Sequence, residues 1–260
     1  MKQVIRLRKH VPSGTIILQR AEQQNALSRW MMLQLKQAFR DMHQEKRVRA
    51  VILTGAGDTF CSGIDLLELQ ETSRQEDAEQ QWHEDAVQYQ ELLETMLLFP
   101  KPIIAAVNGP ALGAGAGLVL ASDIVVAAPE GEFGVPEPRR GLVAGLVAPL
   151  LAYRIAAGPA ANLLLTARTI AAAEAHRWNI YHEVTARDTI WARAHQLAET
   201  CAESAPQSLQ LTKRMLNETI GEQLATLMSA GAAATATART TEAAREGVDA
   251  FLEQREPHWP

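Results

Sequence analysis

Three glycines and one glutamate have the residue types and spacing that could perform chemistry in this chain. Gly113, Gly115 and Gly117 alternate with alanine after an apolar segment, so no Cβ atom there keeps a ligand from the backbone. They open an apolar helix, whose first N–H groups lack partners within the helix and face its positive dipole end. Such groups suit an oxyanion that develops during a reaction. Glu137, in a proline-flanked segment, could move protons beside it. This combination indicates an enzyme.

Other interpretations of these motifs fail on particular residues. The glycine run is not followed by Gly-Lys-Ser/Thr, as a phosphate-binding loop requires, and Leu118 stands where a dinucleotide-binding fingerprint needs its third glycine. Close helix–strand packing is the structural alternative for these glycines. Cys61-Ser62-Gly63 lacks the G-x-S-x-G form of a nucleophile elbow and is interpreted as a tight turn. The seven histidines lie apart, so no metal site is expected.

Composition narrows the class of protein. The chain has 260 residues, 47% of them apolar, which fits one large α/β domain or a domain with a small appendage. A net charge of −5 without a basic stripe argues against a nucleic-acid partner. Two cysteines form no disulfide framework, which favours a reducing compartment. The N-terminus does not resemble a signal peptide, and the longest apolar run, 142–152, is too short to span a bilayer. We expect a soluble, cytoplasmic protein without a membrane partner.

Periodicity predicts a strand-rich first part. Residues 4–8 and 15–18 form a predicted hairpin around Pro12-Ser13-Gly14, and Ser28 caps a helix to about residue 44 whose buried side includes Trp30. Residues 50–54 form a short strand. Segments 103–107 and 123–127 are predicted parallel strands joined by the glycine-rich helix.

Two further regions have a different character. Residues 68–85 are rich in acids and glutamine with few apolar anchors, which predicts either a solvated helix face or an exposed, mobile segment. After Gly158-Pro159 almost everything is predicted to be helical. The predicted helices cover 160–166, 171–178, 189–203, 207–219 and a long stretch that ends with 239–254.

The order of several motifs resembles the crotonase (enoyl-CoA hydratase/isomerase) superfamily. The resemblance covers nearly the whole chain, in the right order. The internal motifs are TFCSGIDL at 59–66, KPIIAAVNG at 101–109, GAG at 113–115, SDI at 122–124, FG at 133–134 and PE at 136–137. RAEQQNAL at 20–27 looks like the family's first CoA-contacting turn, and the segment from Glu246 to Trp259 looks like its C-terminal helix.

The resemblance implies an α/β fold made of a spiral of ββα repeats with a helical C-terminal trimerisation region. We divide the chain accordingly into a core at 1–200 and a trimerisation region at 201–260. It also implies an acyl-CoA thioester as substrate and a homotrimer or dimer of trimers as assembly. Because the CoA moiety belongs to the substrate, no separate cofactor is expected.

The resemblance also implies a set of site residues by motif position. The backbone N–H groups of Ile64 and Ala114 would grip the thioester oxygen, and Glu137 would act as the acid/base. Arg20 is the stronger candidate cation for the CoA phosphates, while Arg255 would depend on a neighbouring subunit. The predicted CoA-binding residues are Arg20, Asn25, Ala26, Ser62, Ile64, Asp65, Leu66, Gly113 and Arg255.

The carboxylates must decide which reaction follows, because the fold does not name it. Family hydratases use two glutamates; the second matches Glu137, but the first falls at Gly117. Loss of one acid/base group commonly costs about 10²–10⁴ in rate, which disfavours the two-glutamate route. The aspartate of dienoyl-CoA isomerases falls near Gly145 and is also absent.

One carboxylate suits a double-bond shift. Glu137 would move a proton from the α-carbon of a 3-enoyl-CoA to its γ-carbon, giving the conjugated 2-enoyl-CoA. Residues 141–151 lack acids and could line a dry acyl pocket that favours proton return over attack by water. Three alternatives stay open: a hydratase that uses Glu68 or Asp65 in place of the missing glutamate, a decarboxylase or hydrolase of the same family, and an acyl-CoA-binding protein without catalysis.

Overall fold

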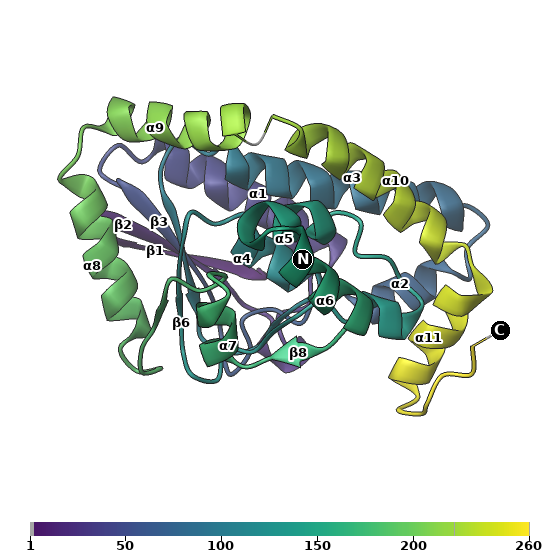
Figure 1. The fold of residues 1–260 in the computed structure, drawn as a ribbon. Coiled ribbons are helices and arrows are strands. Elements are labelled where there is room, and N and C mark those ends of the chain that lie inside the picture. Colours follow the sequence, from purple (N-terminus) through teal and green to yellow (C-terminus); the bar gives the residue numbers. More distant parts are fainter. Residues whose placement is uncertain (1–2, 221, 260) are drawn as a thin grey trace.

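Two sheets and a layer of helices on each side of the larger sheet make up this mixed α/β fold (Figure 1). The computed structural model describes residues 3–220 and 222–259. The strands are β1 (Ile5–His10), β2 (Ser13–Leu18), β3 (Ala50–Gly55), β4 (Ile103–Val107), β5 (Ala111–Leu112), β6 (Ile124–Ala127), β7 (Phe133–Gly134), β8 (Thr169–Ile170) and β9 (Glu183–Val184).

The helices alternate with these strands and then dominate the C-terminal part. The α-helices are α1 (Arg29–Gln44), α2 (Leu66–Thr72), α3 (Ala78–Leu97), α4 (Ala114–Leu120), α5 (Val147–Ile155), α6 (Ala157–Thr166), α7 (Ala172–Arg177), α8 (Ile190–Ala202), α9 (Pro206–Arg214), α10 (Leu224–Arg239) and α11 (Glu242–Leu252). The 3₁₀ segments are η1 (Ala21–Gln23) and η2 (Glu137–Arg140), and a π-helical turn covers Met215–Ile220.

Strand order follows the chain through the large sheet. The order is β1-β2-β3-β4-β6-β9, with β1 and β2 antiparallel and the later neighbours parallel. The short strands β5, β7 and β8 form the second sheet. The pair β4–β5 leads into α4, and the pair β6–β7 leads through η2 into α5, so strand pairs and helices repeat along the chain.

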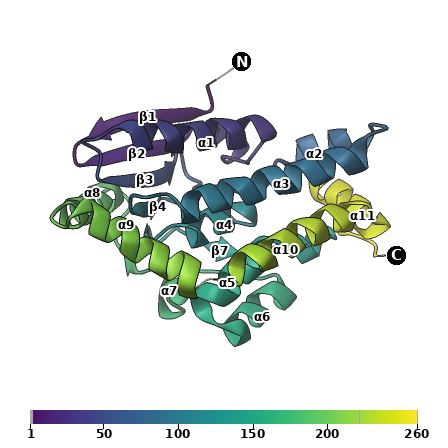
Figure 2. The same cartoon turned by 90° about the horizontal axis from the view of Figure 1, so that it is seen from above.

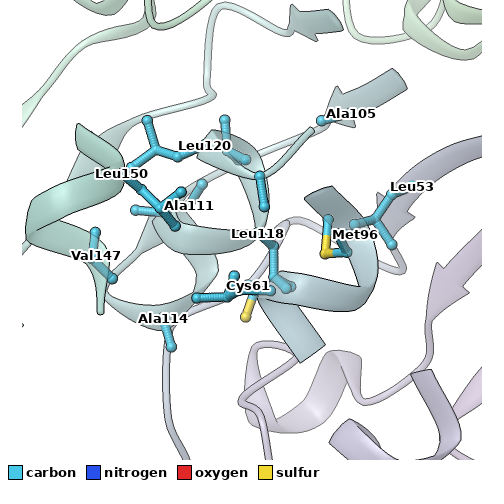
Figure 3. Packing of buried hydrophobic residues seen from close by; sticks show 14 of the residues in the cluster. Leu53, Cys61, Met96, Ala105, Ala111, Ala114, Leu118, Leu120, Val147 and Leu150 are labelled. Carbon is cyan, nitrogen blue, oxygen red and sulfur yellow. The ribbon is translucent and has the colours of Figure 1, made fainter. Parts of the chain in front are cut away.

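Alternate side chains of the central strands serve two cores. Val51 and Leu53 of β3 belong to the large core shared with α1, α3 and α4, whereas Ala50 and Ile52 pack with α8 on the other face. This is the two-residue periodicity of a strand buried on both faces. Figure 3 shows Leu118 of α4 directed toward Met96 and Leu53, while Leu120 lies with the α5 side chains.

The C-terminal helices lie against the segment that follows β7. Helix α10 runs beside α3 in both views (Figures 1 and 2) and also packs on α5, while α11 packs on η2 and α2. These contacts are close at the backbone. A Cβ atom on Gly145 would overlap the carbonyl oxygen of Gly231 in α10, and one on Gly247 in α11 would overlap the backbone of Arg140. Helices α10 and α11 therefore hold residues 137–147 in place.

The structure confirms the hairpin, the α1 helix and the parallel βαβ unit, and it corrects several predictions. Trp30 is 37% exposed rather than buried, because it lies at the solvent side of the first turn of α1. The turn of the hairpin is one residue earlier than predicted, since Ser13 and Gly14 already belong to β2. The predicted 207–219 helix ends as α-helix at Arg214, and the final stretch breaks where Thr241 caps α11.

The solvated helix face predicted for residues 68–85 is present, since residues 73–77, 79, 80, 83 and 84 are exposed, but the opposite side of the same stretch is packed into the protein. Helices α2 and α3 cover most of this stretch, and Trp82 and Asp85 are buried. Trp82 packs in an apolar cluster with Leu69 and Val248, and Asp85 forms an ion pair with α1. Arg29 Nη2 donates to Asp85 Oδ2 at 2.9 Å, and Arg29 Nε donates to Oδ1. A paired carboxylate can be buried where an unpaired one cannot. Within the described residues, no helix has the length and apolar character needed to cross a membrane.

The contact between Gly145 and Gly231 makes a stability prediction. In Gly231→Ala the new methyl group would overlap the Gly145 carbonyl, so the free energy of unfolding should fall by about 1–3 kcal/mol. Gly158→Ala is the matched control, because a Cβ there meets nothing within 4 Å and alanine favours a helix by roughly 0.5–1 kcal/mol. Urea unfolding followed by circular dichroism should show opposite shifts of the midpoint. Equal shifts would contradict close backbone packing of α10.

Candidate active site

One cavity brings together the three predicted catalytic residues, Ile64, Ala114 and Glu137. It lies where the loop after β3, the start of α4, η2 and the segment before α5 meet. Its polar side chains come from Glu137, Tyr89, Thr235 and two arginines, and its apolar wall comes largely from residues 142–147. The predicted apolar stretch after Glu137 therefore does line a cavity. Among the predicted CoA-binding residues, the cavity is lined by Ile64, Leu66 and Gly113.

Two backbone N–H groups at this cavity, those of Ile64 and Ala114, have no hydrogen-bond acceptor in the described part of the chain. The Ile64 segment is held by Leu27, whose N–H donates to the Gly63 carbonyl at 2.7 Å and whose carbonyl accepts from Asp65 N–H. Ala114 is the first residue of α4, where an N–H has no partner within the helix. A Cβ on Gly63 would lie 3.5 Å from the Ala114 nitrogen, so the two segments are side by side.

The three glycines of the 113–117 run do three different things. Gly113 has φ +54° and faces the carboxylate, since a Cβ there would lie 2.7 Å from Glu137 Oε1. Gly115 permits close contact with the backbone of Cys61, and Gly117 faces the hydroxyl of Tyr89. The prediction that all three open the backbone to a ligand is thus corrected: two of them serve packing within the protein.

The Glu137 carboxylate has an oxygen that is shielded from solvent and lacks a hydrogen-bond partner. The residue as a whole is half-buried, but its Oε2 atom is shielded from solvent and has no hydrogen-bond partner among the described residues. Burial raises the pKa of the carboxyl from 4.5 to about 7, against the smaller lowering influence of its own backbone N–H and of Arg140. A carboxyl that titrates near neutrality is suited to accept and return a proton at physiological pH.

Tyr89 occupies the place of the missing first glutamate. Its Oη lies where a Cβ of residue 117 would be, and it donates a 2.7 Å hydrogen bond to the Ala114 carbonyl. Burial, together with Cys61 and Glu137, raises the pKa of the phenol well above 10, so Tyr89 is neutral. The sequence pattern does not single out Tyr89, because in α3 this residue shares the apolar spacing of core residues such as Leu93 and Met96.

The two acids considered as replacements for the missing glutamate do not line the cavity. Asp65 caps α2 by accepting from Leu67 N–H and also pairs with Arg20 at 2.8 Å. Glu68 accepts a 2.9 Å hydrogen bond from the Arg29 N–H. Both side chains are thus engaged in joining loops and helices, and the geometry does not support either as the second acid.

Several predicted CoA-binding residues make contacts within the protein. Arg20 links the 20–27 turn to Asp65 and also donates to the Ala26 carbonyl. Fully buried Asn25 accepts from Arg20 N–H and donates to the carbonyls of Ala56 and Thr59. The Ser62 N–H donates to the Gln24 carbonyl, which joins the two predicted CoA loops. Contacts of these residues with CoA remain predictions.

Arg255 lies outside the residues that line the cavity. Its guanidinium binds Glu246 at 2.6 and 2.9 Å and Glu253 at 2.7 Å beyond the end of α11. These partners raise its pKa, while Arg255 and the His258 N–H lower the pKa of Glu246 to about 2. The contact of Arg255 with CoA through a neighbouring subunit remains a prediction.

The Cys61 thiol is buried, and burial raises its pKa to about 12, which fits a structural residue in a turn rather than a nucleophile. No group of three or more His, Cys, Asp or Glu side chains that could hold a metal ion occurs in the residues described.

Comparison with known proteins agrees with this geometry. A profile of the enoyl-CoA hydratase/isomerase family matches residues 13–260, so the chain belongs to this family within the crotonase superfamily. A Thermus thermophilus protein named "Putative enoyl-CoA hydratase" is 37% identical over 246 residues, covering 95% of this chain and 96% of that protein.

Relatives named for isomerisation and solved structures match over similar lengths. A 1,2-epoxyphenylacetyl-CoA isomerase of Escherichia coli is 32% identical over 255 residues, with 96% of each chain covered. The crystal structure of an enoyl-CoA hydratase/isomerase from Xanthobacter autotrophicus Py2 superposes with a TM-score of 0.89 at 26% identity, with 100% of both chains covered. The predicted fold class is confirmed, and the chain is of the hydratase/isomerase enzyme type.

The pKa of Glu137 makes a prediction about stability. Because folding raises this pKa, the carboxyl stabilises the folded state fully below pH 4.5, and this contribution is lost as pH rises through about 7. The side chain of residue 137 in Glu137→Gln cannot ionise. Above pH 7 the free energy of unfolding of this variant should therefore be roughly 3 kcal/mol higher than that of wild type. The difference should shrink toward pH 5.

Urea unfolding at pH 5 and pH 8 measures this difference, with exposed Glu132→Gln as the matched control. If the free energies of unfolding of wild type and Glu137→Gln differ by the same amount at both pH values, the carboxyl is not shielded in the folded protein.

Proposed function

We propose that the protein isomerises 3-enoyl-CoA thioesters to conjugated 2-enoyl-CoA thioesters. The observation that carries this proposal is a single shielded carboxylate, Glu137, facing Gly113 beside two free N–H groups. The thioester oxygen would accept from Ile64 N–H and Ala114 N–H. Such donors stabilise the enolate that forms when the α-proton leaves, and one donor is typically worth about 10²–10³ in rate.

Proton movement in this mechanism uses one group twice. The ionised Glu137 carboxylate takes a proton from the α-carbon, and electrons shift to give the enolate and move the double bond toward the thioester. The protonated Glu137 then returns its proton to the γ-carbon. The apolar wall at 142–147 keeps the intermediate from water, which supports proton return over hydration. Tyr89 would hold the Ala114 peptide in position for the thioester oxygen.

Hydration of a 2-enoyl-CoA is the second candidate function. It is favoured by relatives named as hydratases, among them a crotonyl-CoA hydratase of Syntrophomonas wolfei that is 30% identical over 255 residues. In the cavity, the Tyr89 hydroxyl oxygen retains acceptor capacity and lies where the first glutamate of a hydratase would begin. It could accept a hydrogen bond from water, but as a neutral phenol it is a poor base.

We also propose the CoA contacts, the assembly and the domain division that the sequence predicts. The loops at 20–27 and 62–66 would bind CoA, and no cofactor beyond the substrate's own CoA is proposed. The division into 1–200 and 201–260 is retained with the assembly as a homotrimer or a dimer of trimers, and a cytoplasmic location is retained as well.

A paired assay distinguishes the two functions. Purified protein should convert 3-hexenoyl-CoA to the conjugated ester and leave crotonyl-CoA unhydrated. Its kcat/KM should rise with pH through about 7, because Glu137 must be ionised to take the proton. Glu137→Gln should lose about 10²–10⁴ of this activity while Glu132→Gln keeps it. Rapid hydration of crotonyl-CoA with slow isomerisation would contradict the proposal in favour of a hydratase.

Introducing the missing glutamate at position 117 tests whether Tyr89 excludes a second carboxylate from the cavity. Gly117→Glu alone should destabilise the protein, because its side chain would overlap Tyr89. Gly117→Glu combined with Tyr89→Ala should hydrate crotonyl-CoA at least about tenfold faster than wild type, since two carboxylates then flank the cavity. Tyr89→Ala alone is the control. A stable Gly117→Glu variant with high hydratase activity would show that Tyr89 does not exclude the second acid.

A further inference from the structure

Two arginines, half-buried Arg140 and buried Arg239, line the same cavity as Glu137, which an ordinary hydrocarbon acyl chain would not require. Arg140 is the last residue of η2, and Arg239 is the last residue of α10. They come from elements that are distant in sequence, and both face a cavity that is otherwise lined largely by apolar side chains. A buried cation is costly unless an anion or several acceptors accompany it.

Arg140 has neither a paired anion nor a hydrogen-bond acceptor in the described residues. Its guanidinium forms no hydrogen bond or ion pair there and lies over the ring of Phe251 at 4.2 Å. The Glu137 carboxylate attracts Arg140 electrostatically but forms no hydrogen bond with it, and the Oε2 atom of Glu137 has no hydrogen-bond partner in the described residues. Burial lowers the pKa of Arg140, as expected for a cation that lacks a close counter-ion.

Arg239 is more deeply buried and weakly paired. Its side chain is 3% exposed, and its Nη1 lies 3.6 Å from Asp85 Oδ2 and 3.5 Å from the Trp82 carbonyl. These distances exceed the roughly 2.7–2.9 Å of a charge-assisted hydrogen bond. Asp85 is already held by Arg29. Burial lowers the pKa of Arg239 to about 10.

A third donor lies beside this pair without an acceptor. The buried Trp82 Nε1 has no hydrogen-bond partner in the described residues, and Trp82 lines an adjoining cavity that shares Arg239 with the first. This part of the molecule therefore has donors and positive charge without a close acceptor, although the carboxylates of Glu137 and Asp249 line the two cavities. The complement is a small anion rich in acceptor oxygens.

We infer that the acyl group of the substrate carries a carboxylate at the end remote from the thioester, and that Arg140 and Arg239 bind it. This rests on the proposed acyl-CoA chemistry at Glu137, because the same cavity must hold the reacting carbons. A guanidinium can bind a carboxylate through two parallel N–H groups, which matches this chemistry better than a hydrocarbon end does. A phosphate of CoA is the other source of oxyanions, and the test separates the two.

Binding of saturated thioesters tests the inference without requiring turnover. Isothermal titration of the intact protein would compare adipoyl-CoA with hexanoyl-CoA and glutaryl-CoA with pentanoyl-CoA, pairs that differ in a terminal carboxylate. One dicarboxylic ester should bind at least about tenfold more tightly than its partner, as expected for hydrogen bonds to a charged group. Arg140→Met should abolish this preference and leave the affinity for the monocarboxylic ester nearly unchanged.

Arg139→Met is the matched control, because Arg139 is adjacent to Arg140 in the sequence but is exposed and does not line the cavity. Arg140→Lys should restore part of the preference, which a merely structural arginine would not require. Arg239→Met should act like Arg140→Met, and circular dichroism checks its fold. If it unfolds, the two Arg140 variants still decide.

Three results would overturn the inference: equal or weaker binding of both dicarboxylic esters, a preference that survives Arg140→Met, or an equal loss for both members of a pair, which would assign Arg140 to a CoA phosphate. A turnover assay with 3-hexenedioyl-CoA and 3-hexenoyl-CoA separates this inference from the proposed function. A binding preference with no isomerisation of either ester would refute the isomerase and leave carboxylate recognition standing.

Discussion

Close backbone contact between the loop at 61–64 and the start of α4 is the constraint on which the site depends. Gly115 lies against the Cys61 backbone, and Gly63 lies against Leu112 and Ala114. Any side chain at Gly115 would push the two segments apart. Because they touch, the N–H groups of Ile64 and Ala114 open on one cavity, although fifty positions separate them in the sequence. The fold thus holds in place the two donors that the proposed mechanism uses, so that they need no rearrangement during the reaction.

The carboxylate depends on a second set of backbone contacts. Gly141 and Gly247 allow η2 to lie directly on α11, and Gly145 allows the next segment to lie on Gly231 of α10. Glu137 therefore sits on a segment held between the second sheet and the C-terminal helices. The dienoyl-type aspartate is absent at Gly145 for the same physical reason, since any side chain there would collide with α10. Changes in these helices should act directly on the position of the acid/base.

Charge is distributed unevenly around the cavity. Glu137 has no hydrogen-bonding partner for Oε2, which keeps its pKa near neutrality, while Arg29 and Asp85 satisfy one another nearby. Arg140 forms no ion pair in the described residues, and Arg239 has only a 3.6 Å contact with Asp85, which Arg29 already binds. A protein that tolerates such groups uses them for a ligand more often than for stability, because unpaired buried charge lowers the free energy of unfolding.

Local patterns in the sequence were enough to predict the hairpin, the α1 helix with its Ser28 cap, the parallel strands around the glycine run and the family. Motif positions singled out Glu137, Ile64, Ala114 and the absence of a carboxylate at Gly117. These follow from periodicity and contiguous motifs, which need no knowledge of distant contacts. Only the tertiary structure decided that one side of α2 and of the start of α3 is buried, that Tyr89 fills the space at Gly117, and that Arg140 and Arg239 share the cavity with Glu137. Each of these depends on helices far apart in the chain meeting in space, and no local spacing records such a meeting.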